Sequence, residues 1–502
     1  MYIVTAKEMY DLDRYAMDEI GLDGRLLMEN AGRAVTDQIE SELSSSDRVL
    51  VLIGKGNNGG DGFVLARTLM QRGYDVTAIQ MVPSSKIEGD AAYHRKLFLN
   101  MGYSVVQYDG QESLERLCEQ SSIIVDAMLG IGVKGEIRSP YREAIQTVNA
   151  SQAYTISVDL PSGVPADEGV KVNQAVKADR TVVIQYPKLS AYLQHTAPFY
   201  GEWIAVDIGL PAPSQHKRSY WGKAQVQSTF PTRHLFSHKG KHGKGLVIGG
   251  ASTMPGSVGL TSRAALKGGA GLLTLATVPS VIQALASSVL EATYISLKDL
   301  NGYILDVKGL DYSYDGIAIG MGMGRQEETV QVLQTVLQKA SCPVVIDADG
   351  LYALQKDASM LDERESPSIL TPHPGEMAHL LGVSIPELLS KPFEYTKSFA
   401  EKHHVFIVFK GAFTIITTPE GAQWVTDTGN SGLAKGGSGD ALSGILLAHI
   451  MQDQSIVEAL CNGTWIHGYT AELLTADIHS QYDLLANDVI EGLAQTYRTL
   501  SL

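Results

Sequence analysis

Short apolar runs alternate with amphipathic stretches along nearly the whole chain, and this alternation is the strongest constraint on its fold. In the first half, the runs expected as strands are residues 47–53, 76–82, 122–127, 156–160 and 181–185. In the second half, they are residues 246–248, 272–277, 316–319, 344–347, 405–409 and 413–417. Strands separated by helices form mainly parallel sheets covered on both faces. The sequence therefore predicts an α/β protein.

The alternation breaks once, at residues 209–218, where proline, serine and charged residues replace it. A chain of 502 residues with 44% apolar composition also exceeds one comfortable hydrophobic core. We therefore expect two domains, residues 1–222 and 223–502, with the boundary placed to within about ten residues. Helices are expected at residues 1–40, 62–72, 326–339, 387–402, 456–475 and 486–500.

Charge and composition exclude several kinds of partner. The formal net charge is −15 and there is no basic tract, which argues against nucleic acid and against an anionic membrane surface. The N-terminus has no charged leader followed by a long apolar core, and no apolar run approaches the roughly 18 residues of a membrane span. The three cysteines are far apart and form neither a disulfide framework nor a zinc pattern. We expect a cytoplasmic protein.

A glycine-rich run, residues 430–440, leads directly into an apolar stretch of helical character and ends on Asp440. Free backbone N–H groups at a helix start can hold phosphate. A carboxylate at such a place would repel phosphate, so Asp440 is better suited to take a proton from a hydroxyl that attacks a held phosphoryl group. The alternative is an aspartate that caps the helix.

A second glycine turn, Gly54 to Gly59, follows the first strand and fits G-x-G-x-x-G. An ordinary Rossmann dinucleotide site is one interpretation. However, the next strand ends in residues 79–86 without the acid expected to bind ribose, and the turn carries the polar residues Asn57, Asn58 and Asp61. Such a set can hydrogen-bond a hydroxylated ring or supply oxygens to a monovalent cation.

Carboxylates follow several of the expected strands. Asp126 and Asp159 end strands in the first half, and Asp159 precedes a rigid Pro-Ser-Gly turn; Asp347 and Asp349 end a strand in the second half. Open α/β sheets bind ligands at the carboxyl ends of their strands. Asp347 and Asp349 are suited to bind magnesium or orient a substrate, whereas the alternative for Asp126 is a turn cap.

The motifs together resemble a known pair of enzyme families. The form Gly437-Ser-Gly-Asp440 resembles the ribokinase-like superfamily, and residues 238–244, 371–376 and 410–414 narrow the match to the ADP/ATP-dependent NAD(P)H-hydrate dehydratases. Residues 54–62, 126–135 and 158–163 resemble the NAD(P)H-hydrate epimerases. In this order, the chain resembles the bifunctional NAD(P)H-hydrate repair enzymes, which implies a Rossmann-like doubly wound first domain and a ribokinase-like second domain.

The resemblance implies an epimerase site in the first half. Asp159 would be the acid-base group, with Lys134 a second candidate, and a potassium ion would be held by Asn58, Asp126 and Ser162. The residues expected to contact the hydrate are Asn57, Asn58, Gly59, Gly60, Asp61, Gly130, Ile131, Gly132, Val133, Lys134, Gly135, Glu136 and Asp159.

The resemblance implies a dehydratase site in the second half. There ADP or ATP, with Mg²⁺, would phosphorylate the hydroxyl of hydrated NADH or NADPH (NADHX or NADPHX), and loss of phosphate would restore the reduced cofactor. Asp440 would be the catalytic base. The substrate contacts would be Ser257, Gly322, His373 and Asp440, and the nucleotide contacts Lys410, Gly411, Ala412, Phe413, Thr414 and Gly439.

Two other functions remain compatible with the residues. One is a ribokinase-like small-molecule kinase fused to a Rossmann module, which would leave a stable phosphorylated product. The other is a non-catalytic protein that senses nucleotides or binds partners. We also expect a homo-oligomer, whereas the sequence leaves open its size, the choice between ADP and ATP and between the two hydrates, and whether both domains are active.

Overall fold

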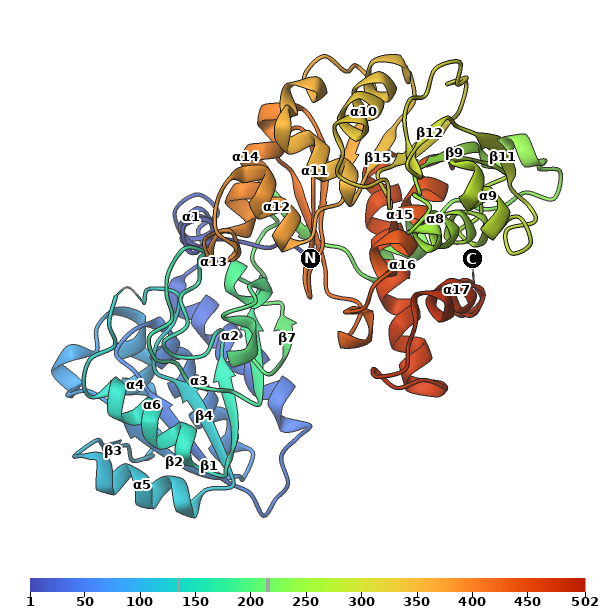
Figure 1. Ribbon diagram of the computed structural model, residues 1–502. Coiled ribbons are helices and arrows are strands. Elements are labelled where there is room, and N and C mark those ends of the chain that lie inside the picture. Colours follow the sequence, from blue (N-terminus) through green and yellow to red (C-terminus); the bar gives the residue numbers. More distant parts are fainter. Residues whose placement is uncertain (134, 214–216, 502) are drawn as a thin grey trace. The chain divides into compact units, whose positions relative to one another are not determined.

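The computed structural model describes residues 1–133, 135–213 and 217–501, and the chain forms two compact units, Met1–His216 and Lys217–Leu502 (Figure 1). The division lies a few residues before the predicted position at 222, because Arg218–Tyr220 pairs with the sheet of the second unit. Both units are α/β, as predicted from the alternation of apolar runs.

The first unit contains one seven-stranded parallel sheet in the order β3-β2-β1-β4-β5-β6-β7. Its strands are β1 Arg48–Ile53, β2 Asp75–Gln80, β3 Val106–Gln107, β4 Ile123–Ala127, β5 Tyr154–Val158, β6 Arg180–Ile184 and β7 Glu202–Val206. The strand order changes direction between β1 and β4. In doubly wound sheets this switch point opens a crevice at the carboxyl ends of the strands.

Helices cover both faces of this sheet: α1 Ala6–Asp18, α2 Gly24–Glu40, α3 Asn57–Gln71, α4 Gly89–Asn100, α5 Gln111–Gln120 and α6 Tyr141–Ala150. Residues Val49, Val51 and Ile53 of β1 pack with α1 to α4, whereas Leu50 and Leu52 pack with α5 and α6. Because both faces are buried, β1 is apolar at every position after its first residue.

The second unit has a ten-stranded sheet in the order β11-β10-β9-β14-β15-β16-β17-β18-β19-β8. Its strands are β8 Arg218–Tyr220, β9 Lys244–Ile248, β10 Leu272–Thr277, β11 Thr293–Ser296, β14 Gly316–Ile319, β15 Val344–Ile346, β16 Ser368–Leu370, β17 Phe406–Phe409, β18 Thr414–Thr417 and β19 Gln423–Thr426. Strand β18 runs antiparallel to both of its neighbours, β17 and β19, so this sheet is mixed and not wholly parallel. A small hairpin joins β12 Asp299–Leu300 and β13 Tyr303–Ile304.

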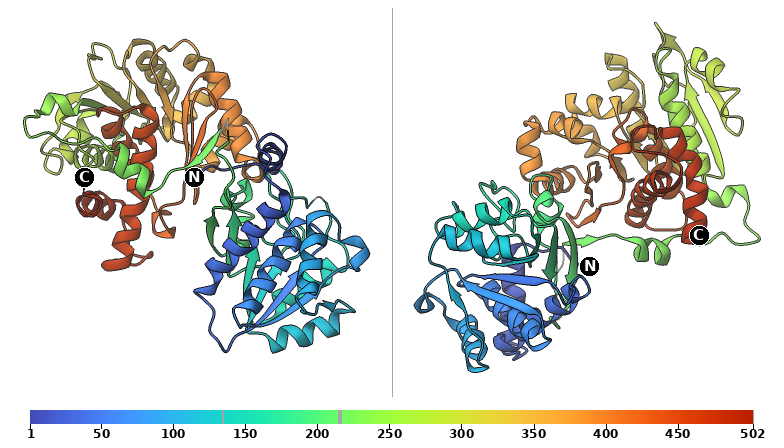
Figure 2. Two further views of the ribbon diagram at one scale, coloured as in Figure 1. Left: turned by 180° about the vertical axis from the view of Figure 1, so that it is seen from behind. Right: turned by 90° about the horizontal axis from the view of Figure 1, so that it is seen from below.

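The helices of the second unit are α7 Lys223–Thr229, α8 Pro255–Lys267, α9 Pro279–Leu285, α10 Glu327–Lys339, α11 Asp349–Lys356, α12 Pro374–Leu381, α13 Ile385–Ser390, α14 Pro392–His403, α15 Ser438–Ile450, α16 Ile456–Asp477 and α17 Ala486–Leu500. Helix α15 is buried along almost its whole length between α8 and α16; the last three helices are red in Figure 2. A helix that is apolar on all sides belongs in a core.

Three predicted helices differ in their limits. The segment 1–40 is two helices, separated at Glu19–Asp23, where Gly21 has φ +84°. The segment 387–402 is interrupted at Lys391, because Pro392 lacks the N–H that a continuous helix needs. Helix α3 begins at Asn57, five residues before the predicted start. Among the residues described, no helix combines the length and apolar character needed to cross a membrane.

Candidate functional sites

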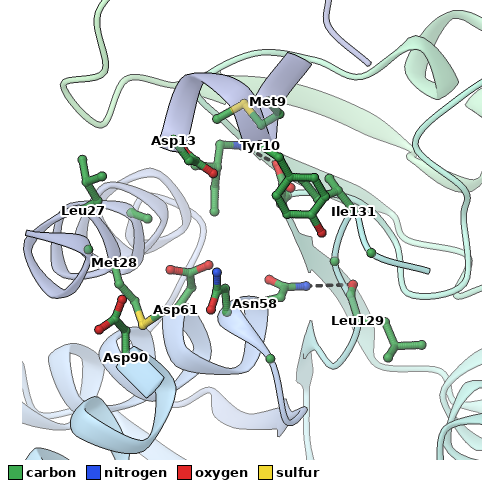
Figure 3. A pocket seen from close by; sticks show the side chains of 18 of the residues that line it. Met9, Tyr10, Asp13, Leu27, Met28, Asn58, Asp61, Asp90, Leu129 and Ile131 are labelled. Carbon is green, nitrogen blue, oxygen red and sulfur yellow. Dashed lines mark hydrogen bonds between the residues drawn. The ribbon is translucent and has the colours of Figure 1, made fainter. Parts of the chain in front are cut away.

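A pocket of about 390 Å³ opens at the switch point of the first unit (Figure 3). It is lined by residues that follow β1, β4, β5 and β6, and by side chains from α1 and α2. Gly54, directly after β1, packs so closely on the Met128 carbonyl after β4 that a Cβ atom would lie 1.7 Å from its oxygen. A glycine is therefore required where the two loops cross.

The polar residues Asn57, Asn58 and Asp61 lie in the opening turns of α3, not in a loop before it. Gly56 is the N-cap of α3, and no side chain caps the helix. The first N–H groups of α3 are therefore available to a ligand at the pocket. Asn57, Asn58 and Asp61 line the pocket, whereas Gly59 and Gly60 are buried beneath it against Gly54 and Met28.

Asn58, Asp126 and Ser162, predicted as potassium ligands, lie together beside the pocket. Asn58 Nδ2 donates to the Leu129 carbonyl at 2.9 Å, which the dashed line in Figure 3 marks, and Ser162 Oγ accepts from Leu129 N at 2.8 Å. Ser162 Oγ donates to Asp126 Oδ1 at 2.5 Å. The buried Asn58 Oδ1 has no hydrogen-bond partner among the described residues.

Asp126 is fully buried at the end of β4. Its carboxylate accepts hydrogen bonds from both the N–H and the hydroxyl of Ser162, from Ser157 Oγ and from Met128 N. Burial raises the pKa of Asp126, and the hydrogen bonds from Ser162 oppose that rise. Asn58 and Ser162 both contact Leu129, and Ser162 contacts Asp126, so the unpartnered Asn58 oxygen belongs to a group of oxygen donors of the kind that a monovalent cation binds.

Asp159 follows β5 with φ +67° and forms an ion pair with Lys188, which lies four residues after β6. The Lys188 side chain is only 1% exposed, and its ammonium group also donates to the Ile184 carbonyl. The Ile184 N–H donates to Asp159 Oδ1 at 3.0 Å. A carboxylate and a lysine are thus fixed at the pocket floor.

Three further carboxyl groups line this pocket: Asp61 on α3, Asp13 on α1 and Asp90 on α4. Burial, followed by repulsion from Asp159 and Asp13, raises the pKa of Asp61 well above its usual value. Burial also raises the pKa of Asp13 to about 6, an effect that Lys188 opposes and Asp159 strengthens. The pocket therefore holds carboxyl groups that bind a proton more tightly than an ordinary aspartate does.

The predicted loop from Gly130 to Glu136 contributes only its first part. Gly130, Ile131, Gly132 and Val133 line the pocket. Gly135 and Glu136 are exposed and do not line it, and Lys134, the second candidate for acid-base catalysis, lies outside the described residues.

In the second unit, Asp440 occupies the first turn of α15, whose N-cap is Gly437 with φ +93°. Burial raises the pKa of Asp440 to about 6; the neighbouring Asp347 adds to the rise, and a hydrogen bond from Ser257 opposes it. Gly322, with φ +61°, packs on Ser257, so that a Cβ atom would lie 3.2 Å from Ser257 Cβ. Three predicted substrate contacts therefore lie together.

Lys410 lies after β17 and forms an ion pair with Asp347, which follows β15, at 2.9 Å. Asp347 Oδ2 accepts from Ser443 Oγ at 2.7 Å. Burial raises the pKa of Asp347, but Lys410 and these hydrogen bonds outweigh it and hold the pKa below its usual value. A Cβ atom on Gly439 would lie 3.2 Å from Lys410 Nζ, so the glycine-rich helix start packs directly on the ammonium group.

The other residues predicted for this site are His373, residues 411–414 and Asp349. His373 caps α12: its Nδ1 accepts from the N–H groups of Gly375 and Glu376, and the side chain is 56% exposed. Gly411, Ala412 and Phe413 lie in the loop that joins the antiparallel strands β17 and β18, and Thr414 begins β18. Asp349 accepts from Gly324 N and pairs with Arg325.

Among the described residues, no three His, Cys, Asp or Glu side chains are arranged to hold a metal ion by themselves. The carboxyl groups around Asp440, which accepts from Ser257, include Asp347 and Asp349. Asp347 is already occupied by Lys410 and Ser443, and Asp349 by Gly324 N and Arg325. Magnesium normally keeps waters and binds one or two carboxylates together with substrate phosphates. The residues therefore fit magnesium carried by a nucleotide.

Sequence reasoning missed Lys188, Asp13 and Tyr10, which all line the first pocket. A lysine shortly after an apolar strand, on the same sheet edge as Asp159, was the available signal for Lys188. Asp13 had no comparable signal, because acidic residues on an amphipathic helix usually face solvent.

Two family models match the chain in succession: one described as YjeF-related protein N-terminus over residues 24–190, and one described as NAD(P)H-hydrate dehydratase over residues 245–493. The chain is 35% identical to the bifunctional NAD(P)H-hydrate repair enzyme Nnr of Moorella thermoacetica, covering 100% of this chain and 97% of that protein. It is 32% identical to the enzyme of the same name from Escherichia coli, covering 96% and 91%.

A solved structure resembles the second unit. The ADP/ATP-dependent NAD(P)H-hydrate dehydratase from Bacillus subtilis, co-crystallised with ATP and Mg²⁺, matches with a TM-score of 0.51 and 35% identity, over 56% of this chain and 98% of that one. Both halves of the chain thus match, in the same order, across nearly the full length of the curated relatives. The chain belongs to the family of bifunctional NAD(P)H-hydrate repair enzymes.

Proposed function

We propose that the pocket around Asp159 interconverts the R and S hydrates of NADH and NADPH, and that the site around Asp440 dehydrates the S hydrate with ADP or ATP. The observation that carries the proposal is the setting of Asp440, a proton-binding carboxyl group at a glycine-rich helix start beside Lys410. A kinase-like fold needs this combination to activate a hydroxyl next to a held phosphate.

At the second site, Asp440 takes the proton of the substrate hydroxyl while the hydroxyl oxygen attacks the terminal phosphorus of the nucleotide. The bond to the leaving oxygen breaks, which releases AMP from ADP or ADP from ATP. Loss of phosphate from the new ester, with a proton from the adjacent carbon, restores the ring double bond. Backbone N–H groups at the start of α15 and Lys410 hold the negative charge, because they are fixed in place before the reaction. Magnesium bound to the phosphates supplies further positive charge.

At the first site, Asp159 acts as the acid-base group while the C–O bond of the hydrated carbon breaks and forms again, and Lys188 fixes the position of that carboxylate. The N–H groups at the start of α3 and the loop from Gly130 to Val133 hold the rest of the hydrate. Asn58 Oδ1, Ser162 Oγ and Asp126 would hold potassium, and the charge of this ion would stabilise the segments that supply these oxygen atoms.

The test is incubation of the full chain with mixed R and S hydrate, magnesium, and ADP or ATP. We expect absorbance at 340 nm to rise until both hydrates are consumed, with one phosphate released for each cofactor restored. A stable phosphorylated product without recovered cofactor would identify a small-molecule kinase instead. The ratio of the rates with the two nucleotides and with the two hydrates decides the preferred substrates.

Potassium is tested separately, by comparing the R-to-S conversion rate in potassium, sodium and lithium salts at equal ionic strength. We expect the highest rate in potassium, and we expect Asn58→Leu to remove the difference between the salts. Equal rates in all three salts for the unmodified chain would contradict the assignment of the ion. Cytoplasmic location and a homo-oligomeric state stay predictions, for cell fractionation and analytical ultracentrifugation respectively.

A further inference from the structure

Helix α1 forms one wall of the first pocket although it lies outside residues 24–190, the part of the chain that the epimerase-related family model matches. The helix is firmly placed. Thr5 and Glu8 form a capping box at its start, and Ala6 N donates to Asp167 Oδ1 at 2.8 Å. Its inner face, including Met9, Leu12 and Ala16, is buried in the core of the unit.

The segment before α1 is tied to the same loop that carries Lys188. Val4 forms a parallel bridge with Lys188: Val4 N donates to the Pro187 carbonyl at 3.0 Å and Leu189 N donates to the Val4 carbonyl at 3.2 Å. The lysine that pairs with Asp159 and the helix that carries Asp13 are therefore held as one piece of structure.

Asp13 points from α1 into the pocket, toward the start of α3 (Figure 3). The charged and titratable groups that share the pocket come from every surrounding element. They are Tyr10 on α1, Lys55 before α3, Asp61 on α3, Asp90 on α4, Asp159 after β5 and Lys188 after β6. Lys188 is committed to Asp159, so Asp13 and Asp61 are left without an ion-pair partner within the described residues.

We propose that Asp13 is a second catalytic residue of the epimerase site, the proton donor to the departing hydroxyl, working from the wall opposite α3 while Asp159 accepts the proton of the returning water. The proposal rests on the proposed function of this pocket. No residue of α1 is part of the predicted site.

The chemistry needs two carboxyl groups with different proton occupancy. Hydration of the reduced ring places the hydroxyl on a carbon next to the ring nitrogen. A proton from Asp13 turns that hydroxyl into water, the C–O bond breaks with both electrons on the oxygen, and the nitrogen lone pair forms a C=N bond. Water then adds to the other face of the planar carbon and gives one proton to Asp159. Bulk water carries that proton back to Asp13, so atoms and charge balance over the cycle.

Proton binding by Asp13 near neutral pH supports this assignment, since burial raises its pKa to about 6. Asp159, fixed by the Lys188 ammonium group, is suited to the accepting role. A donor with this pKa should lose effectiveness as the pH rises above about 6, because the protonated fraction then falls by about tenfold per pH unit.

The experiment measures R-to-S conversion of purified R hydrate without nucleotide, so that the dehydratase is idle, between pH 5 and 8. We expect the unmodified chain to slow as the pH rises above about 6. Asp13→Asn should lower the rate above background at pH 6 by at least about tenfold and should flatten this dependence. Asp18→Asn, on the exposed end of the same helix, is the matched control and should behave as the unmodified chain.

Each outcome decides between alternatives. A structural role for Asp13 would lower the rate but keep the pH dependence, so a retained slope in Asp13→Asn overturns the proposal, as does a rate within twofold of the unmodified chain. Asp13→Glu keeps a carboxyl group at this position and should keep a falling limb; a flat profile there overturns the proposal even if Asp13→Asn does not fold. If Asp159→Ala epimerises normally, the assignment of the pocket itself is wrong.

Discussion

The two sites use the same pairing of a lysine and an aspartate but surround it differently. Asp159–Lys188 and Asp347–Lys410 both lie at the carboxyl ends of parallel strands. In the first unit the pair lies in a pocket with three more carboxyl groups, Asp61, Asp13 and Asp90. In the second unit it lies against Gly439 at the start of α15. The first arrangement is suited to proton transfer between the substrate and several carboxyl groups. The second is suited to proton transfer beside a phosphate group held at the start of a helix.

The two sites differ in which carboxyl groups have no positively charged partner. Lys188 pairs with Asp159, whereas Lys410 pairs with Asp347 and, at 3.9 Å, with Glu376. Three of the carboxyl groups without a lysine partner have raised pKa values: Asp61 and Asp13 in the first unit, and Asp440 in the second. Burial is the largest cause for all three. A buried carboxyl group that lacks a cation binds its proton more tightly, which brings it into the range needed for acid-base catalysis.

The largest expected effect comes from Asp440→Asn. Because the amide keeps the shape of the side chain and removes the base, dehydration of S hydrate should fall by about 10²- to 10⁴-fold, while nucleotide binding stays nearly normal. Calorimetric titration with ATP checks binding, and recovery of absorbance at 340 nm checks turnover. Turnover that survives together with binding would show that Asp440 is not the base.

The second prediction tests whether the two sites are independent. Asp159→Ala should abolish enzymatic conversion of R hydrate and leave dehydration of pure S hydrate unchanged, because the two groups belong to separately folded units. On mixed hydrate, the progress curve should stop after the S fraction, apart from slow spontaneous epimerisation, which makes the observable loss smaller than for Asp440→Asn.

The same progress curves contain the opposing result. If Asp159→Ala runs to completion at the unmodified rate, the epimerase site lies elsewhere. If it slows pure S hydrate as severely as Asp440→Asn does, the two activities share a site and the comparison between the units fails.

The third prediction concerns pH. Asp440 must be ionised to accept a proton, and its pKa is raised to about 6. The kcat/KM for dehydration of S hydrate should therefore fall by about tenfold per pH unit below pH 6, whereas the proposed donor role of Asp13 makes epimerisation slow above that pH. If dehydration slows toward low pH and epimerisation slows toward high pH, the two sites differ in catalytic role as inferred. If both rates change with pH in the same direction, that difference between the sites is contradicted.

The sequence predicted those parts of the fold that depend on local pattern. The eleven strands expected from apolar runs are all present, because strands buried on both faces must be apolar throughout. Eight further strands in the described part of the chain were not predicted: β3, β7, β8, β11, β12, β13, β16 and β19. The resemblance implied Asn58, Asp126 and Ser162 as one set, and the three do lie together beside the pocket. The start of α3 was misplaced by its glycines, which here serve close packing against Gly54 and Met28.

The parts that could not be predicted depend on tertiary placement. Nothing local marks Lys188 as a buried side chain, and its burial depends on Asp159, 29 positions away in sequence. Asp13 reads as a solvated residue of an amphipathic helix, but α1 packs with that position turned toward the pocket. Likewise, the sequence did not show that His373 Nδ1 caps α12, and the contact of His373 with the substrate stays a prediction.

The smallest expected effect is on stability, and its sign is opposite to the effect on activity. The pKa of Asp440 is about 6 in the folded chain against an ordinary 3.8, so above pH 6 the ionised group costs the native state free energy that the unfolded chain does not lose. Asp440→Asn removes this cost and should raise the free energy of unfolding of the second unit at pH 8 by up to about 3 kcal/mol, reduced by whatever the bond from Ser257 contributes. Below about pH 4 both states are protonated and the gain should vanish.

Urea unfolding at pH 8 and pH 4, with the exposed Asp453→Asn as control, measures the difference. A variant that is less stable than the unmodified chain at pH 8 would show that Asp440 is held by favourable contacts, as a structural cap would be, and not kept ready to take a proton.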